Sequence, residues 1–145
     1  SFNSKEAFDR ELISIINQNG AELIVLAGYM RVLTPLFVSN YFGKILNIHP
    51  SLLPKFIGLN THQKAIDASE KIHGASVHFV TDKLDGGPII CQESVTIEAI
   101  DTAKTLSDKV LKKEHIIFPK VIHWYTQRRL KLINNITATL DGKIL

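Results

Sequence analysis

The chain has 145 residues, of which 45% are hydrophobic, and its 17 basic and 14 acidic residues give a formal net charge of +3. This length fits one domain with a sizeable core, and a small basic excess without a Lys/Arg block argues against nucleic-acid binding. The single cysteine excludes an internal disulfide framework, and no apolar run approaches the ~20 residues of a membrane span. We therefore expect a cytoplasmic protein that binds anionic small molecules, and neither nucleic acid nor a membrane.

Apolar periodicity and capping residues predict alternating helices and strands in the first third of the chain. Asn3 or Ser4 can cap the first helix, and Thr34-Pro35 supplies a cap and a first-turn proline for the second. The apolar run at residues 23–26 is typical of a strand buried on both faces of a parallel sheet, and residues 45–48 form the next strand. Together these elements predict a βαβ unit.

The rest of the chain predicts a loop, two helices and several extended segments. In chain order we expect a loop over residues 50–58, a helix over 61–68, strands over 75–80, 88–91 and 94–97, a long helix from residue 101 or 102, and a terminal strand over 130–133 with a hairpin at 141–142. Pro119 lies inside the long helical pattern and should kink the helix or split it in two.

Two polar motifs carry the chemistry. Asn47 and His49 are two residues apart on an extended segment, so they point to the same side, and Pro50 ends the strand there. The carboxyl edge of such a strand is where open α/β sheets bind ligands, and an amide and an imidazole there could stabilise an oxyanion and transfer a proton. Residues 82–87, Asp-Lys-Leu-Asp-Gly-Gly, add two carboxylates in a turn, although aspartate before Gly-Gly can also be a simple turn former.

These motifs resemble those of the phosphoribosylglycinamide formyltransferases of purine biosynthesis. The resemblance rests on residues 47–58, Asn-Ile-His-Pro-Ser-Leu-Leu-Pro-Lys-Phe-Ile-Gly, and on residues 73–88, which end in Asp-Gly-Gly-Pro. Matching segments at residues 27–33, 113–119 and 140–143 extend it over essentially the whole chain. It implies an α/β, Rossmann-like formyltransferase fold with a mostly parallel sheet flanked by helices.

The family's opening strand and its Gly-rich phosphate turn are not in the sequence given. We therefore expect residues 1–145 to form the folate-binding and catalytic portion, the C-terminal two-thirds, of a single formyltransferase domain that here lacks its first βα units. On this view the chain binds a folate better than the nucleotide, because backbone amides that capture phosphate are missing. Its edge at residues 23–26 should expose apolar surface and favour association with another chain.

The resemblance implies transfer of a formyl group from 10-formyltetrahydrofolate, the co-substrate, to the amine of glycinamide ribonucleotide, without a metal. Asn47 and His49 would stabilise the tetrahedral oxyanion, and losing one such donor typically costs ~3 to 4 kcal/mol of transition-state stabilisation. His49 would then protonate the departing N10 as a general acid. Asp85 beside it would favour the protonated imidazole.

The resemblance also assigns the binding residues. For the folate they are Lys5, Met30, Arg31, Val32, Leu33, Asn47, Thr81, Asp82, Lys83, Leu84 and Asp85, and for the nucleotide they are Leu111 and Glu114. Without the resemblance, Met30, Val32 and Leu33 would be ordinary core and Lys5 a solvated helix charge. Among the other histidines, His78 is the best candidate for a supporting role.

Three other functions remain open. Hydrolysis of 10-formyltetrahydrofolate would use the same amide, imidazole and carboxylate with water as the acceptor. Formylation of methionyl-tRNA would need a further tRNA-binding domain and a stronger basic charge. A chain without the phosphate turn could also be a non-catalytic folate-binding fragment. In each case we expect a monomer or a homodimer.

Overall fold

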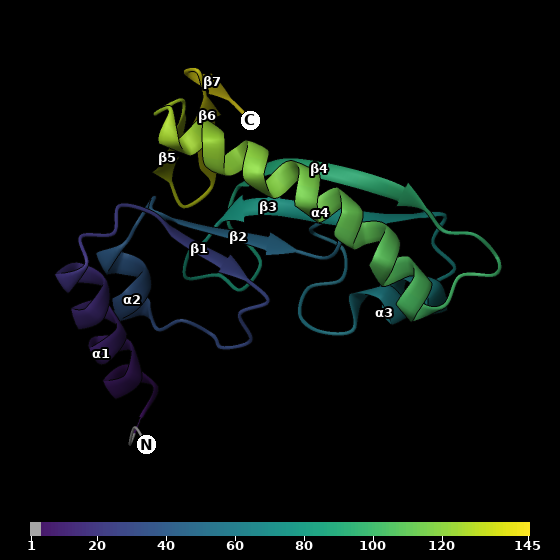
Figure 1. The fold of residues 1–145 in the computed structure, drawn as a ribbon, viewed down its shortest axis with the longest axis horizontal. Helices are drawn as coiled ribbons and strands as arrows, with labels where there is room; N and C mark the ends of the chain where they lie inside the picture. The colour runs from purple at the N-terminus through teal and green to yellow at the C-terminus, as the bar shows by residue number, and fades with distance from the viewer. Residues whose placement is uncertain (1–3) are drawn as a thin grey trace.

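The computed structural model describes residues 4–145, so the proposed cap at Asn3 lies outside the described residues. The helices are α1 (Lys5–Gln18), α2 (Pro35–Asn40), α3 (Thr61–Asp67) and α4 (Ala103–Thr126). The strands are β1 (Ile24–Ala27), β2 (Ile45–His49), β3 (Ile72–Phe79), β4 (Ile89–Thr96), β5 (Leu130–Asn134), β6 (Thr137–Leu140) and β7 (Lys143–Ile144). The α/β class is therefore confirmed (Figure 1).

Hydroxyl side chains begin three of the four helices, as the sequence predicts for the first two. The side chain of Ser4 accepts a hydrogen bond from the amide of Ala7, and that of Thr34 accepts one from the amide of Phe37. Thr102 forms a capping box at the start of α4. Each cap satisfies an amide that the first turn of a helix leaves without a partner.

The main sheet has the strand order β1-β2-β3-β4. Strands β1 and β2 are parallel and are joined through α2, which confirms the βαβ unit. The pairs β2–β3 and β3–β4 are antiparallel, so the sheet of the described residues is mixed rather than mostly parallel. The connection from β3 to β4, residues 80–88, is too short for the crossover that parallel neighbours require, and it therefore forms a hairpin.

Three further expectations differ from the structure. β1 is an edge strand, and its Val25 is 41% exposed. β1 is therefore not buried on both faces, because no described element covers the face on which Val25 lies. The segments predicted at 88–91 and 94–97 form one continuous strand, β4, since pairing with the long β3 orders the residues between them. Helix α4 is one helix through Pro119, so the split into two helices does not occur, because Ile117 and Val121 on either side are fully buried in the core and hold both turns in place; the alternative of a kink stays a prediction.

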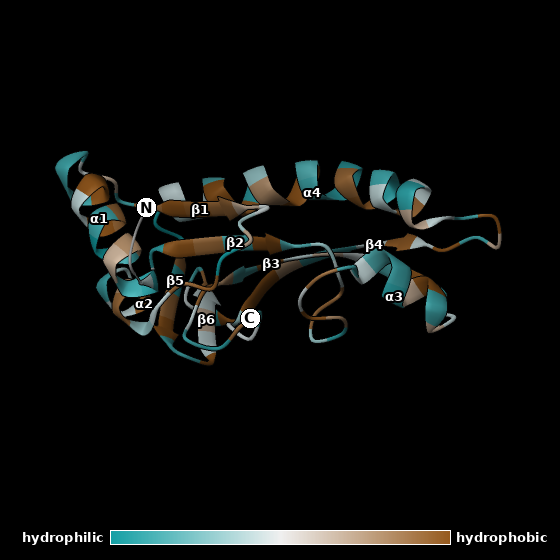
Figure 2. Cartoon of the chain, turned by 90° about the horizontal axis from the view of Figure 1, so that it is seen from below, coloured by the Kyte–Doolittle hydropathy of each residue, from teal (hydrophilic) through white to brown (hydrophobic). Residues whose placement is uncertain are grey.

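The core lies between α4 and the main sheet, where the helix runs along one face of β3 and β4 (Figure 2). Val77 and Phe79 from β3 pack there with Leu106, Val110 and Ile117 from α4, and all five are fully buried. A second cluster joins α1 and α2 to β2. The strands β5, β6 and β7 form a separate small sheet, which confirms the terminal strand and the hairpin predicted at residues 141–142. Within residues 4–145, no helix is long and apolar enough to span a membrane.

The hairpin between β3 and β4 closes tightly at Gly87. A Cβ atom at this position would lie 1.8 Å from the carbonyl oxygen of Phe79, so no side chain fits there. At Gly86 the nearest atoms belong to the flexible side chain of Lys83. The left-handed backbone conformation of this turn is adopted not by a glycine but by Asp85, with φ of 48°.

We expect Gly87→Ala to lower the free energy of unfolding by about 2 kcal/mol or more, because the added methyl group must displace a strand backbone. Gly86→Ala is the matched comparison and should lower it by clearly less, since the atoms in the way belong to the Lys83 side chain, which can change rotamer, and not to a strand backbone. Urea titrations of both variants and the parent chain measure the difference. Equal midpoints for the two variants would contradict this description of the turn.

Candidate active site

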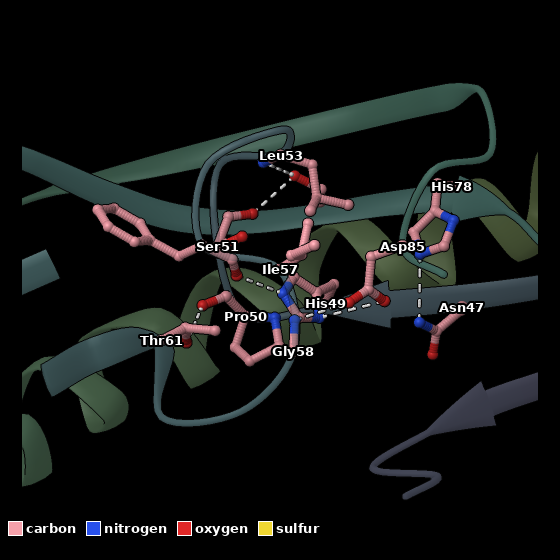
Figure 3. Close-up of polar contacts among 12 residues, drawn as sticks. Asn47, His49, Pro50, Ser51, Leu53, Ile57, Gly58, Thr61, His78 and Asp85 are labelled. Carbon is pink, nitrogen blue, oxygen red and sulfur yellow. Dashed lines mark hydrogen bonds and ion pairs between the residues drawn. The ribbon is translucent and has the colours of Figure 1, made fainter. Parts of the chain in front are cut away.

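The polar side chains of the site stand at the end of β2 and on the neighbouring strand. In the register of β2 and β3, Asn47 lies opposite His78 and His49 lies opposite Ser76. The loop between β3 and β4 then brings Asp85 to the same place (Figure 3). The structure thus brings together the amide, imidazole and carboxylate that the sequence motifs single out.

A cavity of about 80 Å³ opens beside these groups. It is lined by Leu26, Tyr29, Arg31, Val32, Leu33, Asn47, His78, Val80, Thr81, Asp82, Lys83, Leu84 and Asp85. Nine of these are residues that the sequence assigns to folate. His49 is only 6% exposed and does not line the cavity. Its imidazole faces Asp85, which does line the cavity.

The imidazole of His49 has a partner on each side. Its Nε2 atom lies 2.9 Å from the carbonyl oxygen of Phe56, and its Nδ1 atom lies 3.6 Å from Oδ1 of Asp85. A carbonyl oxygen only accepts hydrogen bonds, so Nε2 carries a hydrogen in this arrangement. The nitrogen that remains to exchange a proton on the Asp85 side is therefore Nδ1.

The carboxylate of Asp85 is held by the loop that follows β2. Its Oδ2 atom accepts a hydrogen bond of 2.9 Å from the amide of Gly58. The side chain is only 9% exposed, and the residue adopts the left-handed conformation that aspartate tolerates better than most residues. One oxygen is thus fixed by the loop while the other faces His49.

His78 orients the amide of Asn47. The Nδ1 atom of His78 donates to the carbonyl oxygen of Phe79 at 2.8 Å, which leaves Nε2 as an acceptor 3.2 Å from Nδ2 of Asn47. Burial lowers the pKa of His78, so the neutral ring that this arrangement needs persists near neutral pH. Asn47 thereby keeps one amide hydrogen free to donate into the site, which gives His78 the supporting role that the sequence suggests.

The segment over residues 29–33 is fixed against α1. The carboxylate of Asp9, which is 3% exposed, accepts hydrogen bonds from the amide and hydroxyl of Thr34 at 2.8 and 2.7 Å. Tyr29 lines the cavity, whereas Met30 is 76% exposed and does not line it. Lys5 is exposed on the first turn of α1 and does not line the cavity. The folate roles of Met30 and Lys5 stay predictions.

Glu114 and Leu111 are on α4, outside the cavity lining. Burial raises the pKa of the Glu114 carboxyl, and the positive charges of His115 and His49 oppose that rise. Glu114 is therefore close enough to His49 to be affected by its charge. Leu111, 44% exposed, is one helical turn before it.

A second cavity, of about 180 Å³, lies on the other side of the loop after β2. It is lined by Leu52, Pro54, Lys55, Phe56, Ile72 and His73. Its wall is almost entirely apolar, and it includes none of the three central side chains. Although this cavity is the larger one and His73 lines it, the amide, imidazole and carboxylate of Asn47, His49 and Asp85 meet beside the smaller cavity, so we place the active site there.

His73 is buried below the loop that follows β2. Its Nε2 atom lies 3.2 Å from Nδ1 of His62, and its ring also bonds the backbone of Pro50. Burial, and then the neighbouring His62 and His49, lower the pKa of His73 from 6.5 to about 4. Among residues 4–145, no group of three or more His, Cys, Asp or Glu side chains is arranged to bind a metal ion.

Two contributors to the site could not be expected from the motifs. Phe56 and Gly58 act through backbone atoms, which carry no residue-specific signal. Tyr29 lies within residues 27–33, one of the segments that carry the family resemblance. The sequence of this segment does not show whether Tyr29 or Met30 lines the cavity. In the described part of the chain, the Tyr29 hydroxyl is the one buried side-chain polar atom without a hydrogen-bond partner.

Known proteins that resemble this chain in sequence and structure include formyltransferases and a deformylase. The model of the formyl transferase family matches residues 1–122. The chain is 51% identical over all 145 residues to the phosphoribosylglycinamide formyltransferase of Escherichia coli, and it spans 68% of that protein. A structure of the phosphoribosylglycinamide formyltransferase from Coxiella burnetii superposes with a TM-score of 0.94 at 51% identity, covering 99% of this chain and 67% of that one. A formyltetrahydrofolate deformylase from Pseudomonas syringae gives 0.85 at 29% identity, covering 93% and 45%.

The low pKa of His73 makes stability depend on pH. Below pH 6.5 the unfolded chain protonates this histidine while the folded chain does so only near pH 4, so stability falls as the pH drops through this range. The loss amounts to about 3 kcal/mol at most, at about 1.4 kcal/mol per pH unit. His73→Gln should flatten the dependence between these pH values, while His123→Gln on the exposed side of α4 should not. Urea midpoints measured across the range check this, and an unchanged slope in His73→Gln would contradict it.

Proposed function

The chain belongs to the formyl transferase family, and we propose that it transfers the formyl group of 10-formyltetrahydrofolate to the primary amine of glycinamide ribonucleotide, a step of purine biosynthesis. The observation that carries the proposal is the convergence of Asn47, His49 and Asp85 beside a cavity lined by the predicted folate residues. The 51% identity to a transferase so named in Escherichia coli supports the choice of acceptor.

In the proposed reaction the amine attacks the formyl carbon, and the carbonyl oxygen becomes an oxyanion. The free amide hydrogen of Asn47 and the N–H of a protonated His49 donate to this oxygen. The C–N10 bond then breaks, N10 receives the proton from Nδ1 of His49, and the amine loses one of its own protons. Asp85 lies beside Nδ1, where it can pair with the imidazolium, and it accepts the proton that the amine releases.

The cavity suits the flat ring of a folate. Residues 81–85 from the loop between β3 and β4 line it, together with Arg31, Val32 and Leu33 from the segment after β1. Its lining combines apolar side chains with convergent polar groups that include Asn47 and Asp85, and such groups can orient a small organic ligand. We therefore propose that the folate places its N10 formyl group next to Asn47 and Asp85.

The nucleotide would approach from α4. We propose that Glu114 accepts hydrogen bonds from the ribose hydroxyls, because a carboxylate binds hydroxyls but repels phosphate. Leu111 would contact the sugar from the preceding turn. This placement puts the amine on the His49 side of the cavity, as the proposed attack requires.

Hydrolysis of the same folate is the second candidate. It is favoured by the TM-score of 0.85 to a deformylase, but the identity in that comparison is 29%, against 51% for the transferases. The Asn, His and Asp chemistry does not separate the two reactions, because water and an amine can both attack the formyl carbon. The acceptor must therefore be measured. A non-catalytic folate-binding role, the cytoplasmic location and the oligomeric state stay predictions.

We expect Asp85→Asn to lower the rate of formyl-nucleotide formation by about 100-fold or more, a typical effect of losing a general acid–base group. The fold should persist, since asparagine tolerates the left-handed backbone and its side-chain oxygen can still accept from Gly58. Asp67→Asn, an exposed carboxylate on α3 outside the cavity lining, is the matched control and should retain most activity. Wild-type turnover in Asp85→Asn, with circular dichroism unchanged, would refute the assignment.

We expect Glu114→Gln to raise KM for glycinamide ribonucleotide about tenfold and to leave KM for the folate unchanged, because a neutral amide is a weaker acceptor for sugar hydroxyls. The matched control is Asp108→Asn, a carboxylate on α4 that pairs with Lys104 at the surface. Initial rates measured over both substrate concentrations separate the two constants. A rise in KM for the folate alone would show that Glu114 contacts the folate and not the nucleotide, and would contradict this assignment.

A further inference from the structure

Gln92 on β4 makes two hydrogen bonds to the polar groups that hold the loop after β2. Its Nε2 atom donates to the carbonyl oxygen of Leu53 at 3.0 Å and to Oγ of Ser76 at 2.8 Å. The Ser76 hydroxyl in turn donates to the carbonyl oxygen of Ser51 at 2.7 Å and accepts from the amide of Leu53 at 3.0 Å. Gln92 on β4 and Ser76 on β3 thus both form hydrogen bonds to the loop after β2.

The same loop continues, within a few residues, to the partner of His49. The hydroxyl of Ser51 donates to the carbonyl oxygen of Lys55 at 2.6 Å, which closes the turn between them. Phe56 follows in the left-handed conformation, with φ of 54°, and its carbonyl oxygen faces Nε2 of His49 at 2.9 Å. A bulky residue adopts this conformation only when its surroundings impose it.

We propose that Gln92 is a positioning residue. By fixing residues 51–53 it sets the position of the Phe56 carbonyl oxygen. This oxygen in turn holds the His49 imidazole with a hydrogen on Nε2 and with Nδ1 toward Asp85. Gln92 lies outside the candidate active site and does not line its cavity. The inference deepens the proposed function, since this tautomer leaves Nδ1 as the nitrogen that exchanges a proton with the reacting groups.

Gln92 is a better test of this path than Ser76. Ser76 is fully buried, so replacing it would disturb the core, whereas Gln92 is an exposed residue on the edge strand β4. Gln92→Glu keeps the shape but replaces both donor hydrogens with an acceptor oxygen opposite the Leu53 carbonyl. Gln92→Met removes the hydrogen bonds without adding a charge. The matched control is Gln63→Glu, at an exposed glutamine on α3 whose side-chain amide donates to Asp67 and not to the loop after β2.

The test is a long-range ¹H–¹⁵N correlation spectrum of the histidine rings at about pH 8, where an unperturbed imidazole is neutral. We expect His49, assigned by its loss in His49→Gln, to give the pattern of a single Nε2–H tautomer in the parent chain and in Gln63→Glu. In Gln92→Glu and Gln92→Met its two nitrogen shifts should converge as the Nδ1–H form becomes populated. Unchanged His49 shifts in both variants would overturn the proposal, and so would an Nδ1–H tautomer in the parent.

Two further outcomes are decisive. If both Gln92 variants unfold, Gln92 supports the fold as a whole, and the proposal is wrong. The spectrum needs no substrate, so its result does not depend on formyl transfer, and the two proposals can fail separately. Where transfer is observed, kcat should fall about 10- to 100-fold in both variants with KM for the folate unchanged, because the catalytic group and not the folate site is displaced.

Discussion

The imidazole of His49 is held between a backbone carbonyl and a carboxylate, and both of these partners depend on the same loop. Phe56 bonds Nε2, while the amide of Gly58, two residues later, fixes the oxygen of Asp85 that turns away from the ring. The loop therefore sets the tautomer of the histidine and the orientation of the carboxylate together. A displacement of the loop would change both at once, so the site is as rigid as the contacts that hold residues 50–58.

The sheet supplies the other half of this arrangement. The antiparallel register of β2 and β3 places His78 beside Asn47 and Ser76 beside His49. In each pair the β3 residue supports the β2 residue that belongs to the site. His78 fixes the amide directly, whereas Ser76 acts on the loop. Because β3 is buried on both faces, between α4 on one side and the loop on the other, these supports cannot relax into solvent.

Much of this could be predicted from the sequence, for physical reasons that differ between residues. The caps at Ser4 and Thr34 and the βαβ unit follow from local chemistry, and the shared side of Asn47 and His49 follows from the period of a strand. The backbone contacts of Phe56 and Gly58 could not be predicted, since every residue carries the same amide and carbonyl. Whether α4 is split at Pro119 could not be decided from the sequence, because tertiary packing, which a sequence window does not contain, outweighs the local penalty.

The central claim is that this site delivers a formyl group to an amine and not to water. The most direct measurement uses 10-formyltetrahydrofolate labelled in the formyl carbon and follows where the label goes with and without glycinamide ribonucleotide. Our account predicts that label appears on the nucleotide, that little formate forms, and that release of the unformylated folate depends on the nucleotide. Formate produced at the same rate whether or not the nucleotide is present would contradict it and would identify a hydrolase.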